Sequence, residues 1–250
     1  MRFLESGNAA NKKILMIHGA NIPWQMWDTQ IAYFSKQYRV IVPALDGHDS
    51  ESKTDFISVG QSAQEIEAYY IHTYGTEVFA MIGMSMGAAI VWDIVVSGKL
   101  HAEKLIFDSG VFVRANPLVS RINLKMLIKM NRNAKLRDAK ALKSLENMYG
   151  KRLLAHYLEM ADSMGEQSLA NAVKSMGKYQ LPPKLNVKGM DIAAFLGTNF
   201  MEIMAKKSVR YLRKNYPDSY IKVFNGYRHG ELSVNHPEEF IAEAEKFIQR

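Results

Sequence analysis

The sequence predicts an α/β fold in which helices cover both faces of a mostly parallel, twisted sheet. Short apolar runs rich in β-forming residues alternate along the chain with longer segments of helical periodicity. One segment with helical spacing, residues 88–96, joins two of these runs, and such a strand–helix–strand unit implies parallel strands with a right-handed crossover. A long stretch without strand-like runs, residues 113–180, interrupts the alternation and indicates inserted helices.

Length and composition favour one domain with an insertion. The chain has 250 residues, of which 48% are hydrophobic, and it has no cysteine. The missing cysteine excludes disulfides and thiolate metal sites. We therefore expect an α/β core, residues 1–112 and 181–250, and a helical insertion, residues 113–180. No apolar run is long enough for a signal peptide or a membrane span, so we expect a cytoplasmic protein.

The first third of the chain contains two predicted strands and two predicted helices. Lys13–Ile17 is a short apolar run typical of a buried strand, and Tyr38–Pro43 is a second one. Between them, tryptophan, methionine, isoleucine and phenylalanine recur at helical spacing over residues 24–34. From Ser58 to Tyr74, apolar and aromatic residues alternate with glutamine and glutamate as on an amphipathic helix.

The segment from Val78 to Val91 contains the most informative pattern in the sequence. An apolar strand-like run ends at Gly83, a single serine follows at position 85, and Gly87 opens an apolar helix. This strand–turn–helix with G-x-S-x-G is the pattern of a nucleophile elbow. The turn holds the serine in a strained conformation that exposes its hydroxyl, and the glycines allow strand and helix to approach closely. The free N–H groups at the helix start are suited to an oxyanion.

The second half of the chain completes the sheet. Strands are expected at Leu105–Phe107, Asp191–Gly197 and Tyr220–Phe224, a helix near residues 208–215, and a final helix from Pro237. Leu181-Pro182-Pro183 marks the return from the insertion. We expect three or four helices in the insertion, with breaks at residues 131–133, Gly150 and Gly165.

Charge is distributed unevenly. Residues 113–180 contain 13 Lys and Arg against 5 Asp and Glu, whereas the rest of the chain contains 19 against 20. A basic insertion is explained by a solvated surface, by steering of anionic substrates, or by weak contact with an acidic membrane surface, since apolar residues line the other face of residues 118–130. Nucleic-acid binding is not expected, because the basic residues lack interleaved aromatic residues.

The strand–elbow–helix unit, together with the loops around it, resembles the α/β-hydrolase superfamily. His18-Gly19-Ala20-Asn21 follows the first strand, as in the superfamily's oxyanion loop. The resemblance implies that the N–H groups of Ala20 and Met86 bind the oxyanion, with Asn21 as the neighbouring candidate. It also implies that the insertion is a lid, and it implies neither a metal ion nor an organic cofactor.

The resemblance extends to the last loop, where His229 precedes a His-Pro-Glu-Glu-Phe helix start and is the candidate base for Ser85. The third member of a triad is open. Phe200 stands where the superfamily usually has an acid, three residues after the glycine that ends the penultimate strand. Glu202 and Asp108 compete for the role, and a dyad without an acid is the remaining alternative.

These residues suggest a serine hydrolase that cleaves carboxylic esters of small or medium apolar acids through an acyl-enzyme on Ser85. Several alternatives use the same serine and the same fold: a thioesterase, a lyase, a perhydrolase or a C–C hydrolase. A slow-turnover ligand sensor and an inactive interaction module are two further possibilities. In the enzyme interpretations the partner is a small-molecule acyl substrate.

Overall fold

The computed structural model describes residues 1–182, 185 and 187–250, and Pro183 of the expected return segment lies outside them. Within the described residues, one sheet of seven strands forms the centre of the molecule, in the order β1-β3-β2-β4-β5-β6-β7. Every neighbouring pair is parallel except β1 and β3. The strands are β1 (Arg2–Ser6), β2 (Lys13–Ile17), β3 (Arg39–Ala44), β4 (Glu77–Met84), β5 (His101–Asp108), β6 (Asp191–Gly197) and β7 (Tyr220–Phe224).

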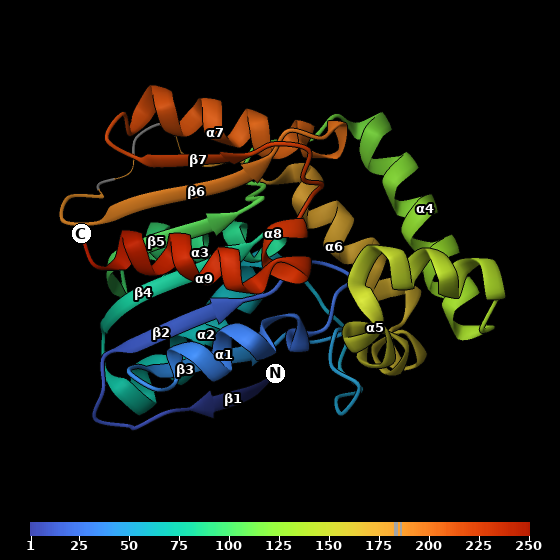
Figure 1. The fold of residues 1–250 in the computed structure, drawn as a ribbon, viewed down its shortest axis with the longest axis horizontal. Helices are drawn as coiled ribbons and strands as arrows, with labels where there is room; N and C mark the ends of the chain where they lie inside the picture. The colour runs from blue at the N-terminus through green and yellow to red at the C-terminus, as the bar shows by residue number, and fades with distance from the viewer. Residues whose placement is uncertain (183–184, 186) are drawn as a thin grey trace.

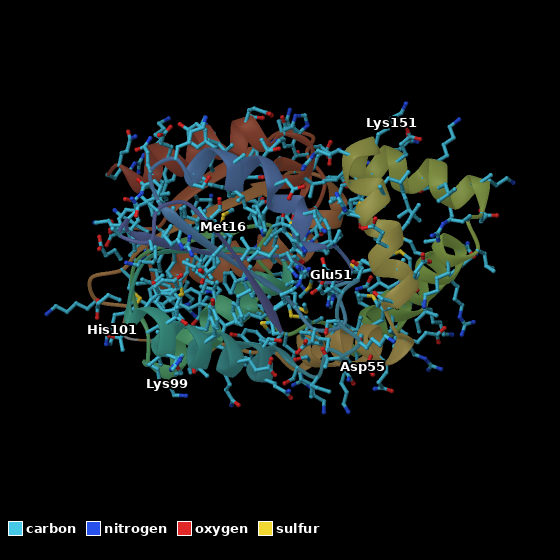
Figure 2. All side chains as sticks on the ribbon, turned by 90° about the horizontal axis from the view of Figure 1, so that it is seen from below. Met16, Glu51, Asp55, Lys99, His101 and Lys151 are labelled. Carbon is cyan, nitrogen blue, oxygen red and sulfur yellow. The ribbon has the colours of Figure 1, made fainter. Side chains whose placement is uncertain are left out.

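Helices cover both faces of this sheet, as predicted (Figure 1). Alternate residues of each parallel strand point to opposite faces, so that Leu15 belongs to one hydrophobic cluster and Met16 to the other. The first cluster includes buried side chains of three helices: α2 (Val59–Tyr74), α3 (Met86–Ser97) and α7 (Ile203–Asn215). The second contains η1 (Trp24–Trp27), α1 (Asp28–Phe34), α8 (Glu231–Asn235) and α9 (Pro237–Ile248). Figure 2 shows Met16 within the packed interior, while Lys99 and Lys151 project from the surface.

Among the described residues, three helices lie between β5 and β6: α4 (Pro117–Lys135), α5 (Ala139–Ser163) and α6 (Glu166–Lys178). They form a hydrophobic cluster of their own and project from one end of the sheet (Figure 1). A kink at Gly150 and a helix start after Gly165 occur where breaks were expected. The break expected at residues 131–133 is wrong, because Asn131 is buried on the inner face of α4 and packing continues the helix to its end at Lys135.

The parallel strands place the candidate site residues at one end of the sheet, where the strands have their C-terminal ends. Met84 at the end of β4 pairs in register with Asp108 at the end of β5, and Gly197 of β6 pairs with Phe224 of β7. The loops that leave these strand ends therefore meet above one edge, where sites form in open α/β sheets. Within the described residues, no helix combines the length and apolar character needed to cross a membrane.

Candidate active site

Ser85 occupies a strained turn between β4 and α3. Its φ of 51° and ψ of −110° lie outside the regions that non-glycine residues favour. The turn is held by two backbone hydrogen bonds to the next strand and its loop: the Ser85 N–H donates to the Asp108 carbonyl at 3.0 Å, and the Val111 N–H donates to the Ser85 carbonyl at 3.2 Å. Neighbouring parallel strands thus enforce the conformation that the elbow needs.

The glycines of the elbow are required by close contacts. A Cβ on Gly83 would lie 2.7 Å from backbone atoms of Gly87, and a Cβ on Gly87 would lie 2.3 Å from the Ile17 carbonyl oxygen. The start of α3 therefore passes directly over the ends of β4 and β2. This approach places the helix N-terminus beside the loop that follows β2.

His229 lies within hydrogen-bond distance of the serine. Its Nε2 is 2.8 Å from Ser85 Oγ, and the imidazole is about one quarter exposed. The next residue, Gly230, adopts a φ of +70° and donates its N–H to Ser109 Oγ at 2.9 Å. The loop after β7 is therefore anchored to the residue that follows β5, and this anchor fixes the height of the imidazole above the sheet.

Glu202 contacts the other side of the imidazole. Its Oε2 lies 3.2 Å from His229 Nδ1, and its Oε1 accepts hydrogen bonds from Ser109 Oγ at 2.5 Å and from the Gly197 N–H at 3.2 Å. The carboxylate is fully buried. Burial alone would raise its pKa, but the hydrogen bonds and the nearby imidazole hold the pKa of Glu202 below its usual value. An ionised acceptor at Nδ1 keeps a proton there and leaves the Nε2 lone pair directed at Ser85.

Asp108, the competing carboxylate, has other partners. Its Oδ2 accepts hydrogen bonds from the Ser233 N–H and Oγ, and its Oδ1 has no hydrogen-bond partner among the described residues. Complete burial, with Glu202 nearby, raises the pKa of Asp108 to about 7. The structure thus places Glu202, and not Asp108, in hydrogen-bond contact with His229.

The candidate oxyanion groups lie at the start of α3 and on the loop after β2, which meet at the elbow. A Cβ on Gly19 would lie 3.2 Å from Ser85 Cβ, so the loop that carries Ala20 runs beside the serine. Met86 is the first residue of α3, and its N–H has no intrahelical acceptor. Asn21 is buried with a φ of 54°, and its Nδ2 donates to the Tyr157 hydroxyl of α5 at 3.0 Å. This last bond ties the helical insertion to the loop.

Two buried histidines beside this loop organise its backbone. His18 Nε2 accepts a hydrogen bond from the Leu45 N–H, and His48 Nδ1 bonds to the Asp46 carbonyl. Complete burial lowers the pKa of His18 to about 3 and that of His48 to about 4. Both imidazoles are therefore neutral at pH 7; His18 connects the loops that follow β2 and β3, and His48 holds the loop after β3.

Two positioning features of the site were not predicted from the sequence. Ser109 bridges the Glu202 carboxylate and the Gly230 N–H. The side chain of Met84 passes between Gly19 and Gly230, and a larger residue at either position would collide with it. A Cβ on Gly230 would lie 2.0 Å from Met84 Cε, and a Cβ on Gly19 would lie 2.6 Å from Met84 Sδ. In the sequence, Ser109 is simply a serine after a strand-end aspartate, and the two glycines lie in distant loops. Neither forms a recognisable pattern, so only the fold reveals these contacts.

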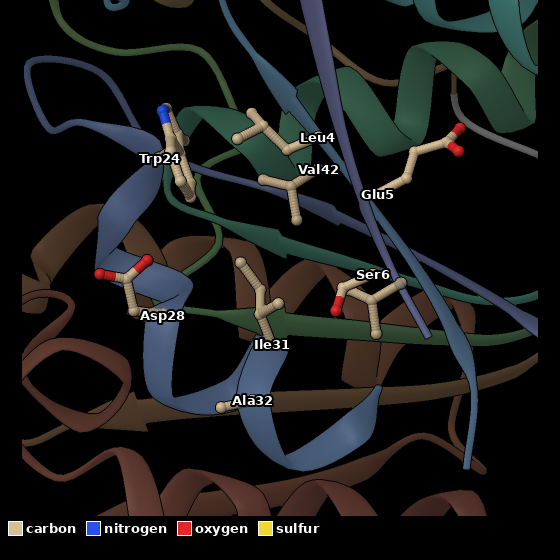
Figure 3. A pocket seen from close by; sticks show the side chains of 9 residues that line it. Leu4, Glu5, Ser6, Trp24, Asp28, Ile31, Ala32 and Val42 are labelled. Carbon is tan, nitrogen blue, oxygen red and sulfur yellow. The ribbon is translucent and has the colours of Figure 1, made fainter. Parts of the chain in front are cut away.

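The hollow drawn in Figure 3 lies away from these residues. It has a volume of about 360 Å³ and is lined by side chains of β1, β3, η1 and α1, such as Leu4, Trp24 and Val42. None of the candidate site residues lines it. Among the described residues, no group of three or more His, Asp or Glu side chains is arranged to hold a metal ion.

Comparisons with known proteins identify the family and the fold. A sequence profile described as the alpha/beta hydrolase family matches residues 14–243. The chain is also similar to the (E)-2-((N-methylformamido)methylene)succinate hydrolase of Acinetobacter baylyi, with 26% identity over 114 residues. That match covers 46% of this chain and 43% of the relative, so the shared region spans less than half of the relative's length.

Solved structures share the fold over nearly the whole chain. An alpha/beta hydrolase family protein from Desulfitobacterium hafniense superposes with a TM-score of 0.76 at 17% identity, covering 98% of this chain and 99% of that one. A thermophilic esterase from Thermogutta terrifontis gives a TM-score of 0.75 at 16% identity, with 99% and 92% covered. A structure described under carboxylesterases of Nitrososphaera gargenis gives 0.75 at 17% identity, with 99% and 93% covered.

Proposed function

The chain belongs to the alpha/beta hydrolase family, and from this premise we propose that it is a serine hydrolase that cleaves carboxylic esters of small or medium apolar acids. The single observation that carries the proposal is the 2.8 Å contact between His229 Nε2 and Ser85 Oγ. A serine hydroxyl in contact with an imidazole that is oriented by a buried carboxylate is the arrangement that activates the hydroxyl for attack on a carbonyl carbon.

In the first half of the reaction, His229 Nε2 takes the proton of Ser85 while Oγ attacks the ester carbonyl carbon. The charge that develops on the carbonyl oxygen is held by the N–H groups of Met86 and Ala20. Glu202 stays ionised and stabilises the imidazolium through Nδ1–H. The tetrahedral intermediate then breaks its bond to the alcohol oxygen, which takes the proton from Nε2 and leaves.

In the second half, water replaces the alcohol. His229 Nε2 takes a proton from the water molecule as its oxygen attacks the acyl carbon on Ser85. The second tetrahedral intermediate breaks its bond to Oγ, which recovers the proton from Nε2, and the carboxylic acid departs. Each half uses the same two oxyanion donors and returns the imidazole to its neutral form.

Carboxylic esters as the substrate class are supported by the structural neighbours, which include an esterase and a structure described under carboxylesterases. It is also supported by the surroundings of the serine, where Met84 precedes the nucleophile and the Tyr157 hydroxyl of the helical insertion reaches the oxyanion loop. The Met84 thioether lies between Gly19 and Gly230, on the two loops that border the serine, and an adaptable apolar side chain at this place suits an apolar acyl group. A thioester has the same acyl carbon and is the second substrate class to assay.

The test is turnover of p-nitrophenyl esters of graded acyl length, from acetate to octanoate, with one thioester beside them. We expect turnover that is abolished by Ser85→Ala and that falls off at the longer chains. Ser219→Ala is the matched control, since Ser219 immediately precedes β7, at the end of the sheet opposite to the site, and among the described residues its hydroxyl bonds to the nearby Tyr216 carbonyl. This control should retain wild-type turnover.

Labelling with a fluorophosphonate separates the remaining outcomes. If Ser85 is labelled but no ester is turned over, the protein is better described as a slow-turnover ligand sensor than as a hydrolase. If Ser85 is not labelled in the folded protein, the hydroxyl is not activated and the proposal fails.

A further inference from the structure

The outer face of α4 exposes a stripe of large apolar side chains. Leu118 is 65% exposed, Val119 51%, Ile122 60% and Met126 55%. Positions 118, 122 and 126 are four residues apart, so they form one continuous row along the helix, with Val119 beside its first turn. Figure 1 shows α4 at the outer side of the helical insertion, away from the sheet. We call these four residues and the cations beside them the α4 outer face.

Basic side chains lie next to this stripe. Arg121, Lys125 and Lys129 are also four residues apart and exposed, and they follow the apolar row along one side. In the part of the chain that the structure describes, these three cations form no ion pair, whereas the nearby Arg132 and Arg137 pair with acidic side chains of α5 and α6. From residue 109 to residue 137 the sequence contains no acidic residue.

The apolar stripe is not needed to hold α4 in place. The opposite side of the helix packs into the hydrophobic cluster of the insertion through Leu124, Leu127, Ile128 and Ala134. Asn131 is buried on the same inner side. Since the inner face accounts for the folding of the helix, the exposed row of four large apolar residues marks a contact surface.

We propose that the α4 outer face binds the surface of an anionic lipid membrane, with the helix lying in the plane of the interface. An apolar row flanked by cations is the pattern of interfacial helices, in which the row enters the headgroup boundary and the cations meet lipid phosphates. The helix of 19 residues provides a contact about 28 Å long. A second copy docked through the same face would bring cations against cations, which opposes self-association.

The experiment is co-sedimentation of the full chain with large unilamellar vesicles. Wild type is mixed with vesicles of phosphatidylcholine alone and with vesicles containing 30% phosphatidylglycerol, at 50 and 500 mM NaCl. We expect binding to the anionic vesicles at low salt and little binding to the neutral vesicles or at high salt. Lys125→Gln combined with Lys129→Gln should weaken partitioning about 10-fold or more.

The apolar row is tested by Ile122→Glu combined with Met126→Glu, which should abolish vesicle binding. Ile57→Glu is the matched control, because Ile57 is 52% exposed but lies in the loop before α2. It should bind like wild type. Both variants should turn over p-nitrophenyl butyrate as wild type does, so the result is independent of the proposed hydrolysis. Circular dichroism verifies that each is folded.

Two outcomes overturn the inference. Equal binding to neutral and anionic vesicles refutes the selectivity for anionic lipid that the cations should provide, and no binding to either removes the lipid surface as the partner. A dimer in size-exclusion chromatography that Ile122→Glu/Met126→Glu converts to a monomer, without vesicle binding by wild type, assigns the face to a second copy of the chain.

Discussion

The substitution Glu202→Gln tests the proposed role of the buried carboxylate. Glu202 Oε1 accepts from two donors, the Ser109 hydroxyl and the Gly197 N–H. A backbone N–H can only donate, so the amide oxygen of glutamine should take the Oε1 place and turn the NH2 group toward His229. The imidazole Nδ1 must then accept a hydrogen bond, which moves the ring proton to Nε2. An imidazole in that tautomer cannot take the proton of Ser85.

The expected loss is large because only the minor tautomer can react. Loss of the orienting carboxylate in a serine–histidine site lowers kcat by about 10⁴-fold, which corresponds to about 5 kcal/mol of transition-state stabilisation. We expect a decrease of about 10³- to 10⁴-fold for Glu202→Gln, measured as kcat on p-nitrophenyl butyrate. KM should change little, since the carboxylate does not face the substrate.

Asp108→Asn is the matched control for this measurement. The two hydrogen bonds from Ser233 to Oδ2 can be kept by the asparagine oxygen, and the NH2 group takes the position of the unpartnered Oδ1. We expect a decrease in kcat of less than about 10-fold. The reasoning is refuted if Glu202→Gln keeps more than one tenth of the wild-type kcat while Asp108→Asn falls further.

Three more predictions follow from the contacts around the elbow. Ser109→Ala removes the bridge between the orienting acid and the histidine loop, and should lower kcat about 10- to 100-fold; an unchanged kcat would contradict the bridge. Asp108→Asn should remove a pH dependence of stability. Burial raises the folded pKa of Asp108 to about 7, above its unfolded value, so the folded protein binds more protons between pH 4 and 7 and wild-type stability falls as pH rises through that range. Urea unfolding at pH 5 and pH 8 should show the variant gaining about 2 to 3 kcal/mol on wild type at the higher pH, and equal differences at both would contradict it. Gly87→Ala places a Cβ 2.3 Å from the Ile17 carbonyl oxygen and should lower Tm by about 5 °C in a thermal scan; no change would show that the helix can shift.

The parallel part of the fold was predicted because its signals are local. Lys13–Ile17 and Asp191–Gly197 are apolar runs with the length of strands, and the helix between β4 and β5 implies that these last two strands are parallel. β1 was not predicted, because Arg2–Ser6 is only half buried and is held by antiparallel pairing with β3. Such pairing joins residues about 40 positions apart, and the sequence around Arg2 carries no sign of it.

The positions of Ser85 and His229 could be predicted for a similar reason, since each stands within a recognisable local pattern. The choice between the carboxylates could not, because it depends on the path of a loop. Asp108 ends β5 and Glu202 follows the end of β6, so both lie at the same end of the sheet, and the sequence distance from either to His229 says nothing about which one faces Nδ1. The 3₁₀ turn at Phe200–Glu202 decides the geometry, and it forms only against the packed neighbours.

The path of this loop also explains how an acid two residues beyond the expected position still meets the histidine. Asn199 caps the 3₁₀ turn by accepting from the Met201 N–H, and the turn brings the Glu202 carboxylate back to the Gly197 N–H at the end of β6. The hydrogen-bond partners of the carboxylate are therefore set by the ends of β5 and β6 and not by the number of residues in the loop. Since Ser109 joins the same carboxylate to the histidine loop, a shortened loop that restored an acid at position 200 should orient the imidazole only if it also kept this serine in contact.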